Sequence, residues 1–320
     1  MPAILRRILL AAPLRLVWTG VLALVLVKLM AWIAPSIMGL SNITLGGSVR
    51  NAVMTVLVFT LSLWLFEGKR PRDAGLALQR AVPDTLYGFL LGAALLTAII
   101  GILAVTGSYR IVGWATLPEG TSRALLLGRV LLAFLAVGIF EEVATRGIVF
   151  RLLEQSIGTW LAIVASALFF GFGHRNNPGA TWVSSVAIAI EAGGLLAAAY
   201  VATRSLWLPI GLHWAWNLFE GPVWGSLVSG NDVGVLARAT FPGPALMTGG
   251  AFGPEAGLPA IVLGAALGVA FLVIAVRREQ IFTPGWMRWI AARARPASPP
   301  VAAPSETPSA PAVSPPAISS

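Results

Sequence analysis

The stretch DTLYGFLLGAALLTAIIGILAVT, residues 84–106, contains one charged side chain, Asp84 at its first position. A helix needs about 20 mostly apolar residues to cross the hydrocarbon core of a bilayer, so this stretch predicts a membrane-spanning helix. The whole chain agrees with it, because 57% of the 320 residues are hydrophobic and 11% are charged, whereas a soluble domain carries about 25% charged residues. The sequence therefore predicts an all-α, polytopic membrane helix bundle.

Further apolar stretches of similar length bring the predicted number of transmembrane helices to about eight. The predicted spans are 16–35, 52–67, 84–106, 124–145, 159–177, 181–203, 206–222 and 257–276. Residues 290–320 are rich in Pro, Ala and Ser, and such a segment cannot bury enough apolar surface to fold. We therefore expect N-terminal transmembrane helices over 1–120, a core that carries the polar groups over 121–230, an outer loop and last transmembrane helix over 231–289, and a disordered cytoplasmic tail.

The basic side chains lie mainly in the loops between these spans and predict how the bundle is oriented. With eight helices, most of them fall at one end: Arg6, Arg7, Arg15, Lys69, Arg70, Arg72, Arg80, Arg151, Arg204, Arg277, Arg278, Arg288, Arg293 and Arg295. The loops at the other end carry Arg50, Arg110, Arg123, Arg175 and Arg238. Cytoplasmic loops are enriched in Lys and Arg, so the sequence predicts a protein of the cell membrane with both termini in the cytoplasm. The net charge of +9 is not gathered on one stripe with interleaved aromatic residues, so no nucleic-acid partner is expected.

Two acidic residues and one basic residue interrupt the apolar sequence at the end of the fourth span. Glu142 and Arg146 are four residues apart, so on a helix they share a face and can form an ion pair. Glu141 points about 100° away from Glu142 and stays available for another partner. This pattern suits one working carboxylate beside one structural carboxylate, although a charge cluster at the membrane surface has the same spacing.

The chain has two histidines and no cysteine, which excludes disulfides, thiolate catalysis and Cys-bound metals. His213 and Asn217 are four residues apart and present an imidazole and a carboxamide on one helical face. Both groups can donate hydrogen bonds to a developing oxyanion, and both can equally bond neighbouring helices. Glu220 shares that face, where it either tunes His213 or lies at the membrane interface. His174 follows the run LFFGFG, residues 168–173, whose glycines allow a close helix approach or a local break.

Three more charged residues, Lys28, Arg129 and Glu191, lie inside apolar stretches. Ionisable groups in membrane segments usually face the interior of a bundle or a water-filled cavity. This reasoning places Glu191 in the interior with an Arg or His partner and extends to Lys28 and Arg129, although a Lys can also reach the interface. All three are interpreted as structural.

The order and spacing of the polar groups resemble a known family. The motif Glu-Glu-x-x-x-Arg at 141–146 is followed by Phe-x-x-x-His at 170–174 and His-x-x-x-Asn at 213–217, each on its own apolar stretch. Together they resemble the CAAX-protease and bacteriocin-processing family of intramembrane proteases, also called CPBP or Abi. The likeness covers residues 141–217, and where it continues to Ser229-Gly230 it looks like the bacterial branch.

The resemblance implies an intramembrane endopeptidase that hydrolyses a peptide bond inside the boundary of the bilayer. It implies that Glu141 and His174 activate a water molecule. It also implies that His213 and Asn217 form an oxyanion hole for the carbonyl oxygen, and hydrogen-bond donors in a dry cavity stabilise an oxyanion far better than they do in water.

The resemblance further implies that Glu142 and Arg146 support the site as an ion pair. The implied substrate is a peptide or protein, which in eukaryotic relatives is a prenylated C-terminal tail. Bacterial relatives are linked to peptide maturation, bacteriocin self-immunity or membrane-protein processing. No cofactor is expected. Zinc is the alternative, because two His and two Glu could ligate it, but there is no H-E-x-x-H helix, Asn is an unusual ligand, and the glutamate mechanism needs no metal.

The eight-helix arrangement raises one geometric difficulty. It puts Glu141 late on a helix that arrives at the cytoplasm and His174 late on a helix that leaves it. Upright helices would separate the two side chains in depth by about 10 Å at a rise of about 1.5 Å per residue. Tilted helices, or a fourth helix that reaches about residue 155, would close this gap, whereas side chains on opposite membrane faces would contradict a catalytic role.

Two other functions compete with the protease. A non-catalytic membrane scaffold or bacteriocin-immunity protein would use the same fold without cleavage, and it would tolerate the change Glu141→Gln. A transporter with a polar site at the midplane would show repeat symmetry with broken helices in matching halves. The sequence has no such symmetry, so the transporter is the weakest of the three hypotheses.

Overall fold

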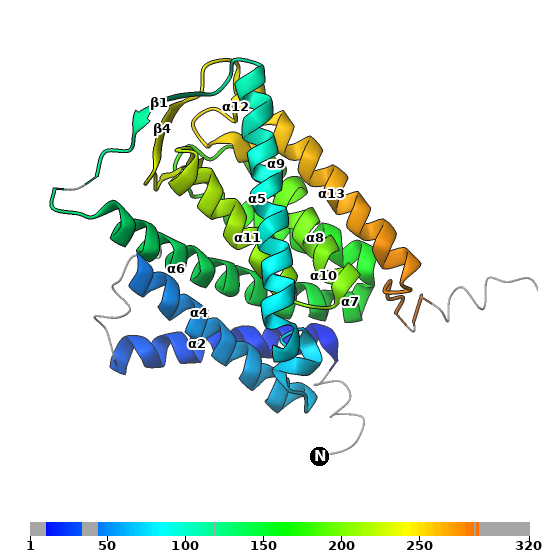
Figure 1. Ribbon diagram of the computed structural model, residues 1–320. Coiled ribbons are helices and arrows are strands. Elements are labelled where there is room, and N and C mark those ends of the chain that lie inside the picture. The colour runs from blue at the N-terminus through cyan, green and yellow to red at the C-terminus, as the bar shows by residue number, and fades with distance from the viewer. Residues whose placement is uncertain (1–10, 34–43, 118, 285, 288–320) are drawn as a thin grey trace, which may run out of the picture. The chain divides into compact units, whose positions relative to one another are not determined.

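The computed structural model describes residues 11–33, 44–117, 119–284 and 286–287 (Figure 1). Contacts group the chain up to Pro284 into one compact unit, and this unit is mostly helical, which confirms the all-α class. Arg6, Arg7 and the tail over 290–320, which the sequence predicts to be disordered, lie outside the described residues. The division of the chain into four regions stays a prediction.

The described α-helices and the π-helical segments that continue them make up the bundle. The α-helices are α2 (Ala12–Ile33), α4 (Leu45–Ser62), α5 (Ala81–Val105), α6 (Arg123–Glu142), α7 (Arg151–Ile157), α8 (Thr159–Gly173), α9 (Trp182–Ile188), α10 (Leu195–Thr203), α11 (Trp207–Leu218), α12 (Ala245–Thr248) and α13 (Leu258–Arg277). The π-helices are η1 (Leu63–Glu67) after α4, η4 (Val143–Phe150) between α6 and α7, η5 (Ala189–Gly194) between α9 and α10, and η6 (Phe219–Val223) after α11.

The remaining elements are short and lie in the loops. The 3₁₀-helices are η2 (Pro71–Ala74), η3 (Leu78–Arg80) and η7 (Pro254–Ala256). Strand β1 (Arg110–Trp114) pairs antiparallel with β4 (Ala237–Thr240), and β2 (Leu227–Val228) pairs antiparallel with β3 (Asn231–Asp232). These two-stranded pairs close loops and form no sheet around which the helices pack.

Six described helical stretches are long and apolar enough to cross a membrane, which confirms a multi-pass membrane protein. They are Ala12–Trp32, Leu45–Glu67, Leu78–Val105, Arg123–Ile157, Trp182–Thr203 and Leu258–Arg277. The predicted spans 159–177 and 206–222 are helical too, but α8 has 15 residues and α11 has 12 before the chain turns into η6. The count of eight spans therefore stays a prediction.

The predicted end of the fourth span at residue 145 is wrong. The helix continues from α6 through η4 and α7 to Ile157, a stretch of 35 residues. The sequence places charges near residue 145, but they do not end the helix, because Glu142 and Arg146 find partners inside the protein and their side chains are 0% and 1% exposed. The segment carrying Arg146 is a π-helix rather than an α-helix, and such wide turns are frequent at functional sites.

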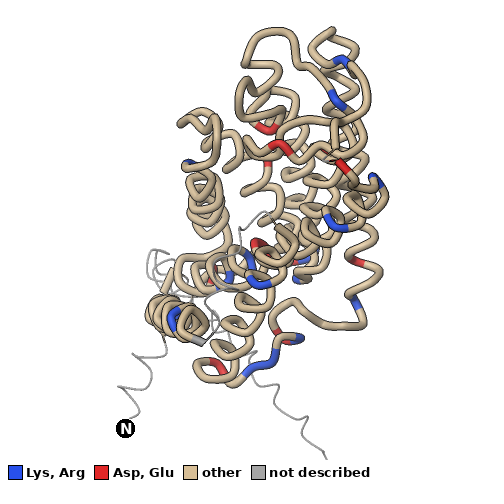
Figure 2. Tube along the Cα trace, turned by 90° about the vertical axis from the view of Figure 1, so that its left-hand side faces the viewer, with Lys and Arg blue, Asp and Glu red and all other residues tan. Residues whose placement is uncertain are grey.

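Large apolar side chains cover the outer faces of the helices. Trp32 is 81% exposed, Val53 60% and Val105 90%, and such surfaces mark contact with lipid or a partner rather than with water. Figure 2 shows long stretches of the chain that carry no acidic or basic side chain. Lys28 and Arg129 are also exposed, so the expected interior position is wrong for Arg129, whereas Lys28 fits the alternative in which it reaches the interface. Their long apolar stems let the charged heads reach toward an interface.

One end of the bundle, which we call the basic end, gathers the loops that the sequence expects on one side. Arg15 Nη1 lies 3.2 Å from Glu67 Oε2, and Arg151 Nη1 lies 2.7 Å from the same oxygen. Arg204 Nη1 lies 2.6 Å from Glu154 Oε2. These contacts join the start of α2, the end of η1, the first half of α7 and the loop after α10, so these segments meet at one end of the bundle as the loop charges predict.

Glycines allow α5 and α11 to approach until their backbones touch. A Cβ added at Gly88 would lie 2.2 Å from the carbonyl oxygen of Leu208, and one added at Gly92 would lie 2.4 Å from that of Leu212. From the other side, a Cβ at Gly211 would lie 2.1 Å from the Thr85 carbonyl oxygen. Small residues four positions apart permit such close helix crossings in membranes. This contact holds α11, which carries His213 and Asn217, at a defined position.

We predict that Gly92→Ala lowers the melting temperature of the purified protein, since the methyl group collides with backbone that cannot move aside and overpacking costs about 1–3 kcal/mol. Gly101→Ala on the same helix is the matched control, because nothing lies within 4 Å of its added Cβ. Intrinsic tryptophan fluorescence on heating measures both. Equal melting temperatures for the two variants would contradict the close α5–α11 contact.

Candidate active site

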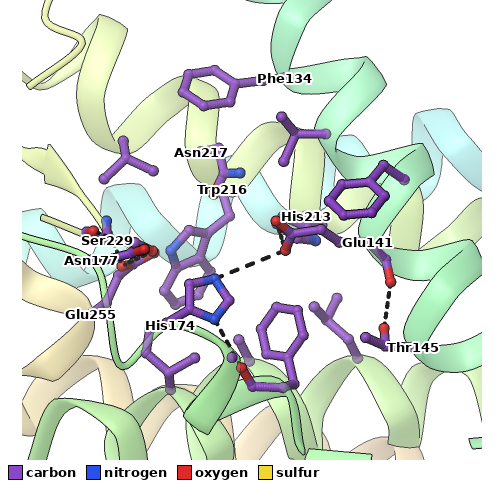
Figure 3. Close-up of a pocket in the computed structure, with 18 of the residues that line it drawn as sticks. Phe134, Glu141, Thr145, His174, Asn177, His213, Trp216, Asn217, Ser229 and Glu255 are labelled. Atoms are coloured by element: carbon purple, nitrogen blue, oxygen red, sulfur yellow. Dashed lines mark hydrogen bonds and ion pairs between the residues drawn. The ribbon is translucent and has the colours of Figure 1, made fainter. Parts of the chain in front are cut away.

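A cavity of about 1010 Å³ lies inside the bundle (Figure 3). Apolar side chains from α6, α8 and α10 form much of its wall, among them Phe134, Phe169 and Leu195. The four residues that the sequence singles out for catalysis also line it: Glu141, His174, His213 and Asn217. The tertiary structure therefore brings together residues from three separate helices that span more than 70 positions of sequence.

The turn at Gly158 explains why Glu141 and His174 lie at the same level. This single residue joins α7 to α8, so the two helices run in opposite directions. Glu141 precedes Gly158 by roughly the same number of residues as His174 follows it, so at about 1.5 Å per residue both lie about 25 Å from the turn. The difficulty raised by the sequence disappears because the fourth helix ends at Ile157, twelve residues beyond its predicted end.

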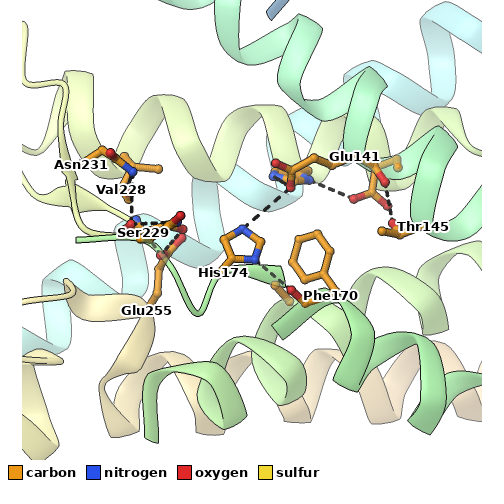
Figure 4. Close-up of polar contacts among 12 residues, drawn as sticks. Glu141, Thr145, Phe170, His174, Val228, Ser229, Asn231 and Glu255 are labelled. Atoms are coloured by element: carbon orange, nitrogen blue, oxygen red, sulfur yellow. Dashed lines mark hydrogen bonds and ion pairs between the residues drawn. The ribbon is translucent and has the colours of Figure 1, made fainter. Parts of the chain in front are cut away.

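Glu141 directs its carboxylate toward His174 (Figure 4) and also lies close to His213. Its Oε2 lies 4.0 Å from His174 Nε2 and 3.7 Å from His213 Nε2, and its side chain is 22% exposed. This oxygen is buried and makes no hydrogen bond to any other described residue. Both separations are longer than a direct hydrogen bond. Glu141 therefore faces the two rings without a direct hydrogen bond to either.

His174 caps the C-terminal end of α8 and is held by its own helix. Its Nδ1 lies 2.9 Å from the carbonyl oxygen of Phe170. A carbonyl oxygen can only accept, so Nδ1 carries the proton and Nε2 presents a lone pair toward Glu141. Gly171 lets α8 approach α9, because an added Cβ would lie 2.2 Å from the Ser185 carbonyl oxygen. The run of glycines therefore allows both the close approach of α8 to α9 and the end of α8 at Gly173.

The ion pair expected between Glu142 and Arg146 is present, at 2.8 Å between Oε1 and Nη1. The same carboxylate oxygen lies 2.9 Å from His213 Nδ1, a contact that sequence spacing could not reveal across 71 positions. Arg146 also donates to Thr145 Oγ1 at 2.9 Å and to the Gly193 carbonyl oxygen at 3.0 Å. Glu142 therefore links the first and third sequence motifs through one buried network and orients the His213 ring.

Asn217 lies one helical turn beyond His213, and both are buried at the wall of the cavity. Figure 3 shows both side chains on the same helix beside Glu141. The shared face expected from their spacing is therefore present. Glu220, whose role the sequence leaves open, is 0% exposed, and among the described residues no hydrogen bond or ion pair joins it to His213.

Further polar residues line the cavity beyond His174. Asn177 Nδ2 donates to the Ser229 carbonyl oxygen at 3.1 Å, and Ser229 donates through its backbone N–H and its Oγ to Glu255 Oε2 at 2.9 and 2.8 Å. Asn231 donates to the carbonyl oxygens of Val228 and Ser229. The sequence indicated Ser229 only as the end of the family likeness and did not single out Glu255, because a lone acid in a glycine-rich loop carries no spacing pattern.

The donor set for a metal is incomplete. No group of three or more His, Asp or Glu side chains within the described ranges is placed to hold a metal ion. Two of the side chains considered for zinc, Glu142 and His213, are engaged with each other at 2.9 Å. The side chains of the cavity are therefore the groups from which a reaction can be built.

Substitution by Gln is predicted to lower the melting temperature at Glu142 but not at the adjacent Glu141. Glu142→Gln leaves Arg146 buried without its counter-charge, and breaking a buried ion pair costs about 3–5 kcal/mol, so the melting temperature should fall markedly. Glu141→Gln removes a carboxylate that has no direct partner and should leave the melting temperature near that of the wild type. Thermal unfolding in one detergent compares them, and equal losses would refute the division of roles.

The comparisons with known proteins agree with the motifs. Residues 123–219 match the family model described as "Type II CAAX prenyl endopeptidase Rce1-like". The matched range contains Glu141–Arg146, His174 and His213–Asn217. No curated protein and no solved structure was found to match the chain. Residues 123–219 are therefore similar to the CPBP or CAAX-protease family that the three motifs predict.

Proposed function

We propose that this protein is an intramembrane endopeptidase that hydrolyses a peptide bond with a water activated by Glu141 and His174. One observation carries the proposal. A carboxylate without a direct partner faces two histidine nitrogens at 4.0 and 3.7 Å inside a cavity within a membrane-embedded bundle. Such separations suit groups that act on one water between them, and a protease family match covers the same residues.

The water would be deprotonated by Glu141 and His174 as it attacks the scissile carbonyl carbon. The lone pair of His174 Nε2 is directed to this place because its Nδ1 proton is bound to the Phe170 carbonyl oxygen. The attack forms a tetrahedral oxyanion and leaves one proton on the Glu141–His174 pair. That proton then passes to the amide nitrogen as the C–N bond breaks, which yields a carboxylic acid and an amine. The remaining proton of the water then passes from the acid to the amine, which gives a carboxylate and an ammonium group.

The oxyanion would be held by His213 Nε2 and the Asn217 carboxamide. Because His213 Nδ1 donates to Glu142, its Nε2 can donate only when the ring is an imidazolium. The carboxylate of Glu142 accompanies that charge as its counter-ion, while Arg146 holds Glu142 in its orientation. Donors fixed in a dry cavity stabilise the developing charge without having to reorganise.

The substrate is proposed to be a membrane-associated peptide or protein, with a lipidated C-terminal tail as one form. The largely apolar wall of the cavity supports this class, since Phe134, Phe169 and Leu195 would contact an acyl, prenyl or apolar peptide chain. Such walls bury most of a ligand's surface while a few polar groups fix its orientation. No nucleic acid is expected as a partner.

Glu141→Gln is predicted to lower the rate of peptide cleavage by about 10²–10⁴-fold, the usual contribution of a general base. Wild type and variant, reconstituted in liposomes, are compared on a set of membrane-inserted peptides by mass spectrometry. His174→Gln is expected to show a similar loss. Identical product profiles for wild type and Glu141→Gln would refute the protease and favour the non-catalytic scaffold.

Cleavage is predicted to persist after removal of metal ions, because the proposed water activation uses Glu141 and His174 without one. Purified protein is treated with a chelator, its metal content is measured by elemental analysis, and its cleavage rate is compared with that of untreated protein. Loss of activity on chelation that zinc restores would show that the zinc-dependent alternative is correct.

We also propose that the basic end faces the cytoplasm, in a cell membrane, with both termini on that side. The absence of native cysteine makes single-cysteine labelling clean. Arg72 and Arg238 are both exposed and lie in η2 and β4. In intact cells, an impermeant maleimide should label Arg238→Cys, whereas Arg72→Cys should react only after permeabilisation. The reverse pattern would invert the proposed orientation.

A further inference from the structure

Two carboxylates line the cavity that the proposed mechanism does not use. Glu191 lies in η5, its side chain is 0% exposed, and neither of its oxygens has a hydrogen-bond partner among the described residues. Glu255 lies in η7, is 4% exposed and accepts the two hydrogen bonds from Ser229 on Oε2. Each lines the same cavity as Glu141, and Glu255 is a charged neighbour of Glu191.

We call Glu191 and Glu255 the acidic pair, and in the described part of the chain no Lys, Arg or His side chain forms an ion pair with either. Among the described residues that line the cavity, Arg50 is the one Lys or Arg side chain, and its Nε and Nη2 donate to Asn51. Arg146 is the other nearby guanidinium, and its Nη atoms are engaged with Glu142, Thr145 and the carbonyl oxygens of residues 192 and 193.

A buried carboxylate without a counter-charge or a hydrogen-bond donor is costly. The cost is removed when a ligand supplies a cationic donor. A single ammonium or guanidinium group in the cavity can donate to both oxygens of Glu191 and to Glu255 at once, because these groups carry three and five N–H bonds. A metal ion fits less well, because no group of three or more acidic or His side chains in the described part of the chain is placed to ligate one.

The acidic pair is connected to the reaction centre from two directions. Glu191 immediately precedes Ala192 and Gly193, whose carbonyl oxygens accept from Arg146, the partner of Glu142. Glu255 is bound by Ser229, whose carbonyl oxygen accepts from Asn177, three residues after His174. Because the acidic pair and the reaction centre line one cavity, a single substrate chain can contact both.

We propose that Glu191 and Glu255 form a specificity subsite for a Lys or Arg side chain of the substrate near the scissile bond, since both carboxylates line the same cavity as Glu141. This inference rests on the proposed function. The substrate class is then an apolar, membrane-associated peptide that carries one cationic side chain beside the cleaved bond. The apolar wall binds its flanks, and the acidic pair sets the position of the bond.

The first experiment compares cleavage of matched peptides. Starting from a peptide that the wild type cleaves, Lys or its uncharged analogue norleucine is placed at each of the two positions on either side of the scissile bond. At one position the wild type should prefer Lys by about tenfold or more in kcat/KM, the effect of one favourable charge pair. Glu191→Gln and Glu255→Gln should each bring that ratio toward one, while cleavage of the norleucine peptide is retained.

Glu119→Gln is the matched control, since Glu119 is exposed in the loop before α6, and it should keep the wild-type ratio. Melting temperatures show whether each variant is folded. If either Glu191→Gln or Glu255→Gln does not fold, the other variant still tests the subsite. Equal cleavage of Lys and norleucine peptides by the wild type at all four positions would overturn the subsite and leave the protease function standing.

A second measurement separates the subsite from catalysis. In Glu141→Gln protein, fluorescence anisotropy measures the affinity for labelled Lys and norleucine peptides. Tighter binding of the Lys peptide, lost when Glu191→Gln is added, supports the subsite even if the wild type cleaves no peptide, an outcome that would refute only the proposed function. Equal affinities in this assay would mean that the acidic pair binds no cationic side chain, as expected if both carboxyl groups are simply neutral.

Discussion

The carboxylate of Glu142 is the contact on which the rest of the site depends. One of its oxygens holds both Arg146 and His213, at 2.8 and 2.9 Å, in a place closed to solvent. Through Arg146 the same group reaches the carbonyl oxygens of η5. Two charges and a ring that are removed from water tolerate few alternative arrangements, because each alternative leaves a buried group unpaired. The network therefore fixes η4, η5 and α11 relative to one another.

Backbone geometry supplies the second constraint. The turn at Gly158 sets α7 and α8 antiparallel, and Gly92 and Gly211 let α5 support α11 at backbone contact. Because these contacts involve main-chain atoms, they place His174 and His213 more firmly than side-chain packing alone would. Reacting groups that are held at defined separations make a bimolecular step effectively unimolecular, which lowers the activation barrier of a catalysed reaction.

Four glutamates near one cavity show how environment assigns different tasks to one residue type. Glu142 is neutralised by Arg146 and serves as a support. Glu141 keeps partial exposure and faces two imidazoles without a direct hydrogen bond, which suits its proposed role as proton acceptor. Glu191 and Glu255 are buried without a cationic partner in the described cavity wall. Glu142 directly precedes the π-helix η4 and Glu191 lies in η5, where wide turns aim side chains that a regular α-helix would direct elsewhere.

The sequence by itself determined the membrane helix bundle and the pairing of Glu142 with Arg146, because hydropathy over about 20 residues and a spacing of four are local properties of a helix. Only the tertiary structure decided that the fourth helix passes its charges and ends at Ile157, since that depends on partners such as His213, 71 positions away from Glu142. It also decided that Glu255 shares a cavity with Glu141. Long-range contacts of this kind leave no periodicity in the sequence.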